Sequence, residues 1–429
     1  MLGATSGSTT PAALIDGPML NHKIYTDPSI FSMEMERIFA TAWIYLGHEC
    51  QLQESGSFFL GHMGQASVIV TRDRHGEIHV LENRCAHRAA PVCSELSGSA
   101  AAFMCPYHGW TYALDGTLKG MPLASDYKGD FPKKDRGLRR VARVSRYRGF
   151  IFASMAEEGP DLVTFLGAAR IALDDFMDRA PEGTLELCDD VPLRHRYRGN
   201  WKIQFENLND FVHPGFAHAS AMNAATNVAE AGNGDGIVGV IGGFNDFIKK
   251  LQGLESIRTE YGHSFIPGFA KMSGSFQQAD SELQAVLAEK CGEDEASRIV
   301  DTDIWVALIY PSLIIKPGNQ NLRIVRPLAA DETEITMHSF KMPGAPPRVF
   351  DEAHDYYRLL GSPASPILAD DLAIYEMVQA DYGREYHISA ERGYQGENAD
   401  QPDIVSGTSE AYILNQYSVW KSYMTGAAL

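Results

Sequence analysis

The chain has 429 residues, with 37 Lys and Arg against 55 Asp and Glu, which gives a formal net charge of −18. A hydrophobic fraction of 45% and a charged fraction of 21% are ordinary for globular proteins, so the composition excludes a disordered chain, a fibre and a disulfide-stapled miniprotein. The length allows roughly two to four domains, and the negative charge argues against nucleic acid or an anionic membrane as a partner, because both attract clustered Lys and Arg.

The sequence also lacks the signals of membrane insertion and secretion. It has no run of about 18 uncharged apolar residues, so we expect no membrane-spanning helix. Its first residues lack the basic and apolar stretches of a secretory signal. The six cysteines are too scattered for a disulfide framework, so we expect a cytoplasmic protein in which cysteines beside histidines act as metal or redox ligands.

The N-terminal region is predicted to be a tail followed by a helix. Residues 1–20 are small and polar, which is typical of a loose tail. The pair Asp27-Pro28 predicts a helix start, because Asp is a frequent N-cap and Pro is favoured at the first helical position. The residues of this helix expected to face inward are Ile30, Phe31, Ile38 and Phe39.

From residue 43 the hydrophobic period becomes two, which predicts β-strands. Residues 67–71 and 77–82 predict a hairpin, with Gly76 in its turn. Short strands and Gly/Pro turns continue to a last predicted strand at residues 148–153. We therefore predict a small all-β domain over residues 43–157. The helical region that precedes it, residues 1–42, is predicted to pack on the later domain, residues 158–429.

The remainder, residues 158–429, mixes helices and strands, which predicts an α+β domain with helices packed on a sheet. A helical pattern over residues 161–179 ends at Pro181 and Gly183. The Gly-rich residues 229–248 are expected to form a mobile loop or lid. The other predicted strands are residues 304–315, 321–327 and 334–341, and the other predicted helices are residues 348–360, 367–380 and 409–424.

Two short segments each supply one thiolate and one imidazole: Cys85 with His87, and Cys105 with His108. A [2Fe–2S] cluster with two thiolates on one iron and two imidazoles on the other needs this supply, and its neutral imidazoles raise the reduction potential to about −150 to +300 mV. A structural zinc site uses the same ligand types. Zinc fingers, however, group their cysteines together and their histidines together, so the order found here favours the cluster.

The spacing C-x-H-x17-C-x2-H is similar to the Rieske motif. In Rieske proteins of respiratory chains each segment carries a further cysteine, and the two form a disulfide. Here these positions hold Ala90 and Tyr107, so the chain resembles the oxygenase or ferredoxin branch. Trp110 is expected to cover the cluster, although packing alone would also explain this residue.

A second set of possible ligands, Asp210, His213 and His218, follows later in the chain. Histidines near carboxylates suit Fe(II). Asp210 and His213 are about one helical turn apart and can share a face, whereas His213 and His218 would be splayed by roughly 140° on a regular helix. Pro214 and Gly215 supply a break that could let both histidines face one ion.

The third ligand has to come from another segment. Residues 366–378 predict an apolar helix with two carboxylates near its start, Asp370 and Asp371. A buried carboxylate is costly unless a partner such as a metal satisfies it, but acidic residues near a helix start also interact favourably with the helix dipole without a metal. Periodicity leaves the choice between these two carboxylates open.

Together these motifs resemble the catalytic α subunit of Rieske non-haem iron aromatic ring-hydroxylating oxygenases. Their overall spacing is similar to that of the terephthalate-type enzymes, which act on aromatic acids. The resemblance implies that a small all-β Rieske domain is inserted in a larger catalytic domain, whose antiparallel sheet is covered by helices in a START or helix-grip arrangement. It implies that His213, His218 and Asp371 bind the mononuclear iron, because the second Asp of the late pair is the ligand in this family. Asp210 would link His213 to a Rieske histidine of the neighbouring subunit, and Asn207 is a further candidate catalytic residue.

The resemblance also implies a terminal oxygenase that hydroxylates an aromatic substrate with O2 by cis-dihydroxylation, with an aromatic carboxylate as one candidate. Electrons from NAD(P)H would arrive through a separate reductase, with or without a ferredoxin, and the assembly would be a homotrimer, or α3β3 with a small β subunit. A G-x-G-x-x-G match at residues 234–239 lacks the preceding strand of a dinucleotide-binding unit, so it does not predict a nicotinamide site. The residues predicted to line the substrate pocket are Leu208, Phe211, Phe216, Arg326 and Ile367.

Three other interpretations stay open. The first is a Rieske-type monooxygenase that performs a single hydroxylation or a demethylation. The second is a Rieske electron-transfer protein without oxygenase activity, which would leave the second ligand set unexplained, and the third is a zinc-stabilised binding protein. Arg326 could hold a substrate carboxylate or form a structural ion pair, and the ion pair is the more common role of such a residue.

Overall fold

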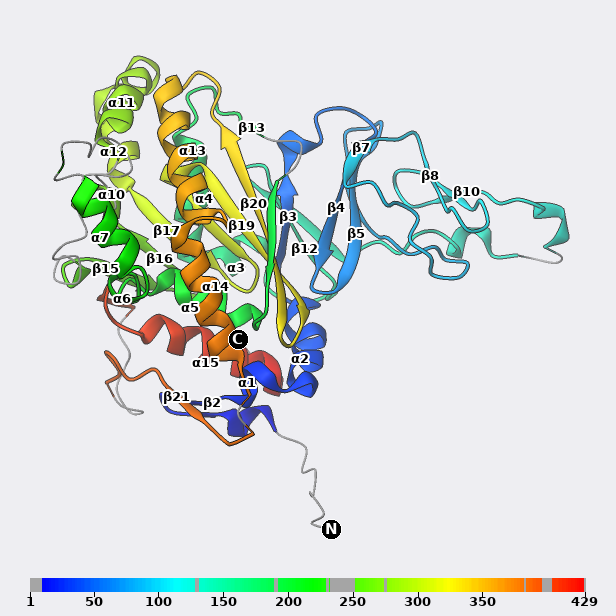
Figure 1. Ribbon diagram of the computed structural model, residues 1–429. Helices are drawn as coiled ribbons and strands as arrows, with labels where there is room; N and C mark the ends of the chain where they lie inside the picture. Colours follow the sequence, from blue (N-terminus) through cyan, green and yellow to red (C-terminus); the bar gives the residue numbers. More distant parts are fainter. Residues whose placement is uncertain are drawn as a thin grey trace, which may run out of the picture. The chain divides into compact units, whose positions relative to one another are not determined.

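The computed structural model describes residues 10–127, 131–188, 192–228, 231, 251–273, 276–381, 383–395 and 403–427. Contacts divide the chain into two compact units (Figure 1). The large unit combines residues 1–38 with residues 165–429, and the small unit is residues 39–164. The small unit is thus inserted in the sequence of the large one, and the predicted limits at residues 42/43 and 157/158 stay predictions of the domain boundaries.

The predicted helix at Asp27 is present. Asp27 caps α2 (Pro28–Glu34) by accepting a hydrogen bond from the backbone N–H of Ser29 at 2.8 Å. A π-helical turn, η2 (Met35–Phe39), continues the helix. All four apolar residues predicted to face inward are at most 7% exposed, so the N-cap and the apolar spacing located this helix correctly.

The prediction of a loose tail is wrong for residues 10–20, and residues 1–9 lie outside the described residues. Leu14 and Leu20 are buried and anchor this segment on the large unit. Its strands pair with each other and with a strand near the C-terminus. These elements are η1 (Pro11–Leu14), β1 (Ile15–Asp16), β2 (Met19–Asn21), α1 (Lys23–Thr26) and β21 (His387–Ser389).

The small unit is all β, as predicted. Its described residues form antiparallel sheets with the strand orders β6-β5-β4-β7, β11-β12-β3 and β10-β9-β8. The predicted hairpin is β5 with β6, and Gly76 turns the chain at φ +84°, a conformation that favours glycine. The last predicted strand begins at Phe150, because Arg148 and Gly149 form the turn before it. The strands are β3 (Ile44–His48), β4 (Ser57–Met63), β5 (Ala66–Arg72), β6 (Ile78–Glu82), β7 (Ser97–Ser99), β8 (Phe103–Met104), β9 (Thr111–Tyr112), β10 (Leu118–Gly120), β11 (Arg143–Tyr147) and β12 (Phe150–Ser154).

The large unit is built on an antiparallel sheet with the strand order β13-β20-β19-β18-β17-β16-β15-β22, and β14 also pairs with β20. Every residue of β17 is buried, which requires cover on both faces of the sheet, and β17 contacts helices α4 and α5. Figure 1 shows α13 and α14 running across the yellow strands β19 and β20. The strands are β13 (Glu186–Leu187), β14 (Leu193–Tyr197), β15 (Glu255–Arg258), β16 (Ser264–Pro267), β17 (Ile304–Ile309), β18 (Leu313–Lys316), β19 (Asn321–Ala329), β20 (Glu332–Lys341) and β22 (Ile404–Ser406).

The helices of the large unit confirm the predicted helical segments at residues 348–360, 367–380 and 409–424. The prediction of a single strand at residues 304–315 is wrong, because this segment forms two antiparallel strands, β17 and β18. They are joined by a turn at Pro311, which lacks the backbone N–H that a central strand needs. The predicted loop at residues 229–248 lies outside the described residues. The helices are α4 (Ile171–Asp178), α5 (Trp201–Asn209), α6 (Pro214–Ala217), α7 (Ala219–Val228), α10 (Phe269–Ser273), α11 (Gln277–Cys291), α12 (Glu293–Thr302), α13 (Pro347–Gly361), α14 (Pro366–Gln379) and α15 (Ala411–Thr425).

A buried carboxylate, Glu34, holds helix α5 in place. It accepts hydrogen bonds from Nζ of Lys202 at 2.6 Å, Nε1 of Trp201 at 2.9 Å and Nε1 of Trp420 at 2.7 Å. These donors belong to α5 and α15, whereas Glu34 ends α2. The cluster therefore joins three segments that are distant in the sequence and fixes the helix that leads into the candidate metal site.

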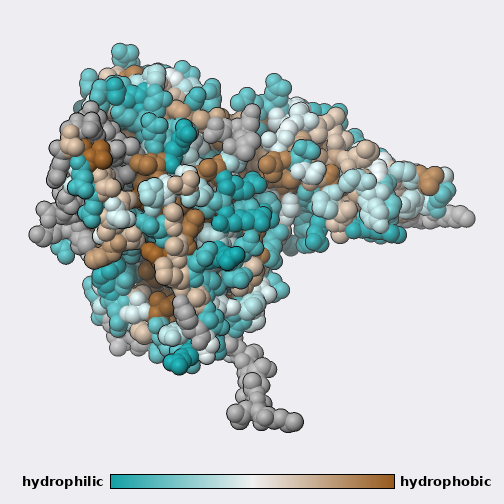
Figure 2. All heavy atoms as spheres, viewed as in Figure 1, coloured by the Kyte–Doolittle hydropathy of each residue, from teal (hydrophilic) through white to brown (hydrophobic). Residues whose placement is uncertain are grey.

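The surface agrees with the composition. The face shown in Figure 2 is largely hydrophilic, and its hydrophobic residues lie in small patches. Within the described part of the chain, no helix is both long enough and apolar enough to cross a membrane.

Candidate functional site

The two cysteine–histidine segments of the small unit have the same backbone hydrogen-bond pattern. The carbonyl of Cys85 accepts from the N–H of Ala89, four residues on, and the N–H of Cys85 donates to the carbonyl of Ala90. The carbonyl of Cys105 likewise accepts from the fourth residue on, Gly109, and the N–H of Cys105 donates to the fifth, Trp110. In both loops the fourth residue has a positive φ, +57° and +68°. The sequence therefore folds both segments into one type of loop, each presenting a thiol and an imidazole.

The side chains of these loops meet. Cys85 and Cys105 are buried free cysteines, and the ring centroids of His87 and His108 lie 4.6 Å apart. Nδ1 of each histidine is buried without a hydrogen-bond partner. Two buried imidazole nitrogens without protein partners, beside two thiols, fit the donor set that a [2Fe–2S] cluster with two thiolates and two imidazoles requires.

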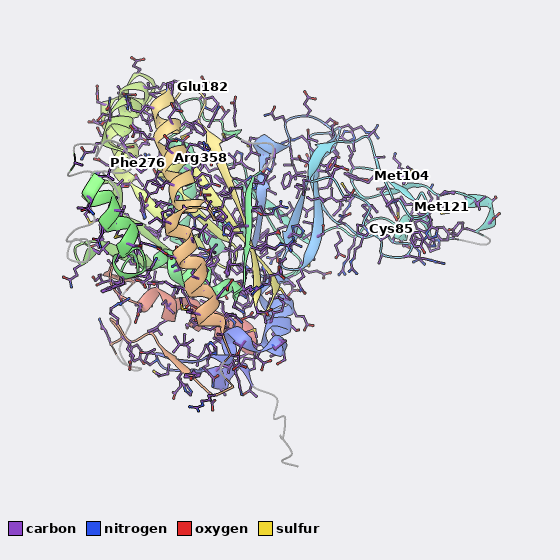
Figure 3. The ribbon with its side chains drawn as sticks, viewed as in Figure 1. Cys85, Met104, Met121, Glu182, Phe276 and Arg358 are labelled. Carbon is purple, nitrogen blue, oxygen red and sulfur yellow. The ribbon has the colours of Figure 1, made fainter. Side chains whose placement is uncertain are left out.

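Aromatic residues support this site. Trp110 is 3% exposed and stacks on the ring of His87, with centroids 4.9 Å apart. The hydroxyl of Tyr112 lies 3.1 Å from Sγ of Cys85 and accepts a hydrogen bond from the N–H of Ala86. Figure 3 labels Cys85 in this part of the small unit. Sequence reasoning missed Tyr112, which lies seven residues beyond Cys105 on β9 and carries no motif of its own.

The second ligand set begins where helix α5 ends. Asp210 is the C-cap of α5, and Pro214 starts the short helix α6 instead of interrupting a longer one. The expectation that Asp210 and His213 share a helical face is therefore wrong, because these residues lie between helices. Oδ1 of Asp210 accepts from the N–H of Val212 at 2.7 Å, which tightens the connection. The break places His213 and His218 with their ring centroids 5.5 Å apart.

Helix α14 supplies the carboxylates. Oδ1 of Asp371 lies 3.5 Å from Nε2 of His213 and 3.3 Å from Nε2 of His218. One donor atom from each of these three residues lies within 4.8 Å of the others. On the other side of the ring, Nδ1 of His218 lies 3.4 Å from Oδ2 of Asp370. The two adjacent carboxylates thus contact opposite nitrogens of one imidazole, an arrangement in which Asp371 faces the common point and Asp370 orients His218.

Asn207 lies against the same group. Its Nδ2 is 3.1 Å from Nε2 of His213 and donates to Oδ1 of Asp371 at 3.2 Å. Burial lowers the pKa of His213, whereas hydrogen bonding and charge attraction from Asp371 outweigh burial at His218 and raise its pKa. Two imidazoles and one carboxylate that converge in this way match the donor set of a 2-His-1-carboxylate iron site. Asp210, predicted to link two centres, lies 3.6 Å from the guanidinium of Arg392.

The three donors line a cavity in the large unit. The cavity holds about 790 Å³ of space between atoms, part of which is open to solvent. Its walls are mostly aromatic and aliphatic side chains from α5, β17, α13 and α14. The lining residues outside the metal group are Leu208, Asp210, Phe211, Pro214, Met222, Phe269, Trp305, Lys316, Arg323, Tyr356, Leu360, Ile367 and Leu368.

Three of the five predicted pocket residues line this cavity, and two do not. Phe216 is 71% exposed on α6. Arg326 donates to Oε1 of Glu334 at 3.2 Å, which is the structural ion pair left open above. The basic residues that line the cavity are instead Lys316 and Arg323, which sequence reasoning missed. Arg323 lies three residues from Arg326 on strand β19, and strand side chains alternate between faces, so the two point to opposite sides of the sheet.

Comparison with protein families identifies the chain. The family described as "Ring hydroxylating alpha subunit (catalytic domain)" matches residues 180–426, and the family described as "Rieske [2Fe-2S] domain" matches residues 42–134. The chain belongs to the ring-hydroxylating alpha-subunit family. This alpha subunit is therefore an oxidoreductase with a Rieske cluster and a mononuclear iron, and the predicted family, fold class and cofactors are confirmed.

Relatives span nearly the whole alpha subunit. It is 31% identical to toluate 1,2-dioxygenase subunit alpha from Pseudomonas putida, over 94% of this chain and 90% of that relative. It is 29% identical to N,N-dimethyl phenylurea N-demethylase subunit alpha from Sphingobium sp. (strain YBL2), over 96% of this chain and 92% of that relative. Its fold matches naphthalene 1,2-dioxygenase with indole bound, with a TM-score of 0.82 and 24% identity over 98% and 96% of the two chains.

Proposed function

We propose that this alpha subunit adds both atoms of O2 to an aromatic ring bound in the cavity of the large unit. The observation that carries this proposal is the convergence of one donor atom each from His213, His218 and Asp371 within 4.8 Å, at the wall of a largely apolar cavity. These three residues would hold Fe(II), which supplies O2 activation and leaves positions open for it. The cluster residues of the small unit, Cys85, His87, Cys105 and His108, would hold the [2Fe–2S] centre, which supplies electrons one at a time.

The residues around the iron ligands would prepare the site. Asp370 accepts a hydrogen bond from Nδ1 of His218, so it fixes the tautomer that leaves Nε2 free for a metal. Asn207 joins His213 and Asp371 through its amide and limits their movement. The aromatic walls, including Phe211 and Phe269 stacked at 5.3 Å, exclude water and fix the plane of the substrate ring.

The reaction needs partners. One aromatic ring, one O2, two electrons and two protons give one cis-dihydrodiol, and the electrons would come from NAD(P)H through a separate reductase, with or without a ferredoxin. The relatives named above are α subunits of larger enzymes, which supports an assembly of several chains. We propose a homotrimer, or an α3β3 assembly with a small β subunit. In this assembly Asp210 would connect His213 to the cluster of a neighbouring subunit.

Isotope labelling tests the proposal. The holoenzyme would be supplied with a surrogate reductase, 18O2 and a panel of aromatic acids and hydrocarbons, and products would be analysed by mass spectrometry. We expect two labelled atoms in one diol, and loss of product in His213→Ala but not in a control, His387→Ala, which is exposed on β21. One labelled atom, or formaldehyde from an N-methyl substrate, would show the monooxygenase function instead. A reducible cluster with no product from any compound would indicate an electron carrier.

A further inference from the structure

Two basic residues of the cavity lie next to each other on neighbouring strands. In the register of β18 and β19, Ile314 pairs with Arg323, and Lys316 pairs with Asn321. Residues two apart on a strand share a face, as do cross-strand partners, so Lys316 and Arg323 are diagonal neighbours on one face. Both side chains line the cavity that also contains the His213, His218 and Asp371 donors.

Neither residue forms an ion pair in the part of the chain that the structure describes, although the charge of Asp371 acts on both cations without touching them. Arg323 is 6% exposed, and its Nε is buried without a hydrogen-bond partner. Nζ of Lys316 lies 5.2 Å from the centre of the Trp305 ring, a contact that does not neutralise its charge.

Among the described residues of the large unit, the other two buried cations are paired. Arg179 lies 2.9 Å from Asp175 and 3.1 Å from Asp280, and Lys202 lies 2.6 Å from Glu34. Burying a cation without an ion-pair partner is costly. These other cations have such partners, whereas Lys316 and Arg323 face a cavity without one in contact. Burial and the neighbouring Arg323 lower the pKa of Lys316 to about 7, and the charge of Asp371 offsets only part of this shift. A bound anion would relieve this cost.

We propose that Lys316 and Arg323 form an anion subsite that binds the carboxylate of an aromatic monocarboxylate and directs its ring toward the His213, His218 and Asp371 group. This inference rests on the proposed function and adds the substrate class. An aromatic acid matches both kinds of group that line the cavity: aromatic rings such as Phe269 and Trp305, whose centroids lie 4.1 Å apart, suit its ring, and the guanidinium and the amine suit its carboxylate. A neutral ring of the same shape would leave both cations unpaired, which disfavours its binding.

Calorimetry with an acid and its neutral amide tests the subsite. The anaerobic holoenzyme would be titrated with 4-methylbenzoate and with 4-methylbenzamide. We expect the acid to bind at least about tenfold more tightly. Arg323→Met and Lys316→Met should each weaken binding of the acid at least about tenfold and leave binding of the amide unchanged. Arg323→Lys, which keeps the charge, should restore part of the affinity.

Two matched controls separate the subsite from a general effect of charge. Arg326→Met removes an arginine from the same strand but the opposite face, and Lys341→Met removes a lysine that lies over Phe350 outside the cavity. Neither should change binding of the acid. Equal affinity for acid and amide in the wild type, or equal weakening of both ligands in Arg323→Met, would overturn the inference. If the Met variant does not fold, the comparison of the two ligands in the wild type and in Arg323→Lys still decides.

The binding test and the oxygenation test can fail separately. If the enzyme oxygenates neutral rings but binds acids no better, the subsite is wrong and the proposed function stands. If acids bind through Lys316 and Arg323 but no compound of the panel is oxygenated, the subsite stands and the proposed function is wrong.

Discussion

The adjacent carboxylates of helix α14 give a sharp test of the metal site, because they touch the same histidine from opposite sides. Oδ1 of Asp371 lies 3.3 Å from Nε2 of His218 and 3.5 Å from Nε2 of His213. Oδ2 of Asp370 lies 3.4 Å from Nδ1 of His218. The substitutions Asp371→Asn and Asp370→Asn make the same chemical change at adjacent residues. Asp371→Asn affects His213, His218 and Asn207, whereas Asp370→Asn affects only Nδ1 of His218.

The expected effects differ in size. Asp371→Asn removes one of the three proposed ligands, so the mononuclear iron should be lost on dialysis, with an affinity decrease of more than about 100-fold, beyond the range for loss of a group that only orients a ligand. Asp370→Asn removes only the group that orients His218, and loss of such a partner lowers metal affinity by about 10- to 100-fold, or about 1.4–2.7 kcal/mol. Neither change touches the cluster loops of the small unit, so the cluster should stay intact in both variants.

Iron analysis and electron paramagnetic resonance measure both quantities. The reduced cluster gives the Rieske signal, and iron beyond two atoms per cluster reports the second site. We expect wild-type cluster signals in both variants, no third iron in Asp371→Asn, and a third iron in Asp370→Asn that chelators remove more easily. The reasoning is refuted if Asp370→Asn loses this iron while Asp371→Asn keeps it.

Three further predictions concern the buried charges and the cluster loop. Glu34→Ala should lower the free energy of unfolding by about 3–5 kcal/mol in a denaturant titration, because it leaves the charge of Lys202 buried without a partner. Unchanged stability would contradict the proposed role of Glu34 in holding helix α5. Tyr112→Phe should lower the reduction potential of the cluster by on the order of 50 mV, because it removes a hydroxyl that lies 3.1 Å from Sγ of Cys85. The size follows from the free energy of one hydrogen bond, since about 1.4 kcal/mol corresponds to 59 mV for one electron. Voltammetry of both proteins measures this shift. Lys316→Met should stabilise the ligand-free large unit by about 1–3 kcal/mol at pH 6. The full shift of the Lys316 pKa, at about 1.4 kcal/mol per pKa unit, would give a larger gain, but the amine is partly solvated. Since the pKa of Lys316 is lowered to about 7 in the folded state, this gain should be complete below pH 7 and shrink as the pH rises toward its ordinary value of 10.5, which unfolding at pH 6 and pH 9 would show.

The chemistry of the cluster was readable from local sequence because each of its loops is short. Cys85 and His87 are two residues apart, and Cys105 and His108 three, so each pair is held by one tight loop with its own hydrogen bonds. The N-cap at Asp27 was readable for the same reason, since the contact is with Ser29. Interactions within a few residues are fixed by the backbone, and their spacing is enough to predict them.

Residues far apart in the sequence were decided by the tertiary structure. Helical periodicity could not choose between Asp370 and Asp371, because both lie on apolar stripes, and only the packing of α14 beside the connection after α5 brings Asp371 to the histidines. The basic residues of the cavity show the same limit. Arg326 and Arg323 are similar in local sequence, but the register of β19 turns one toward Glu334 and the other into the cavity. The sequence by itself therefore determined which chemical groups the protein carries, and the tertiary structure decided which of them meet, because strand register and helix packing are set by contacts that no local pattern contains.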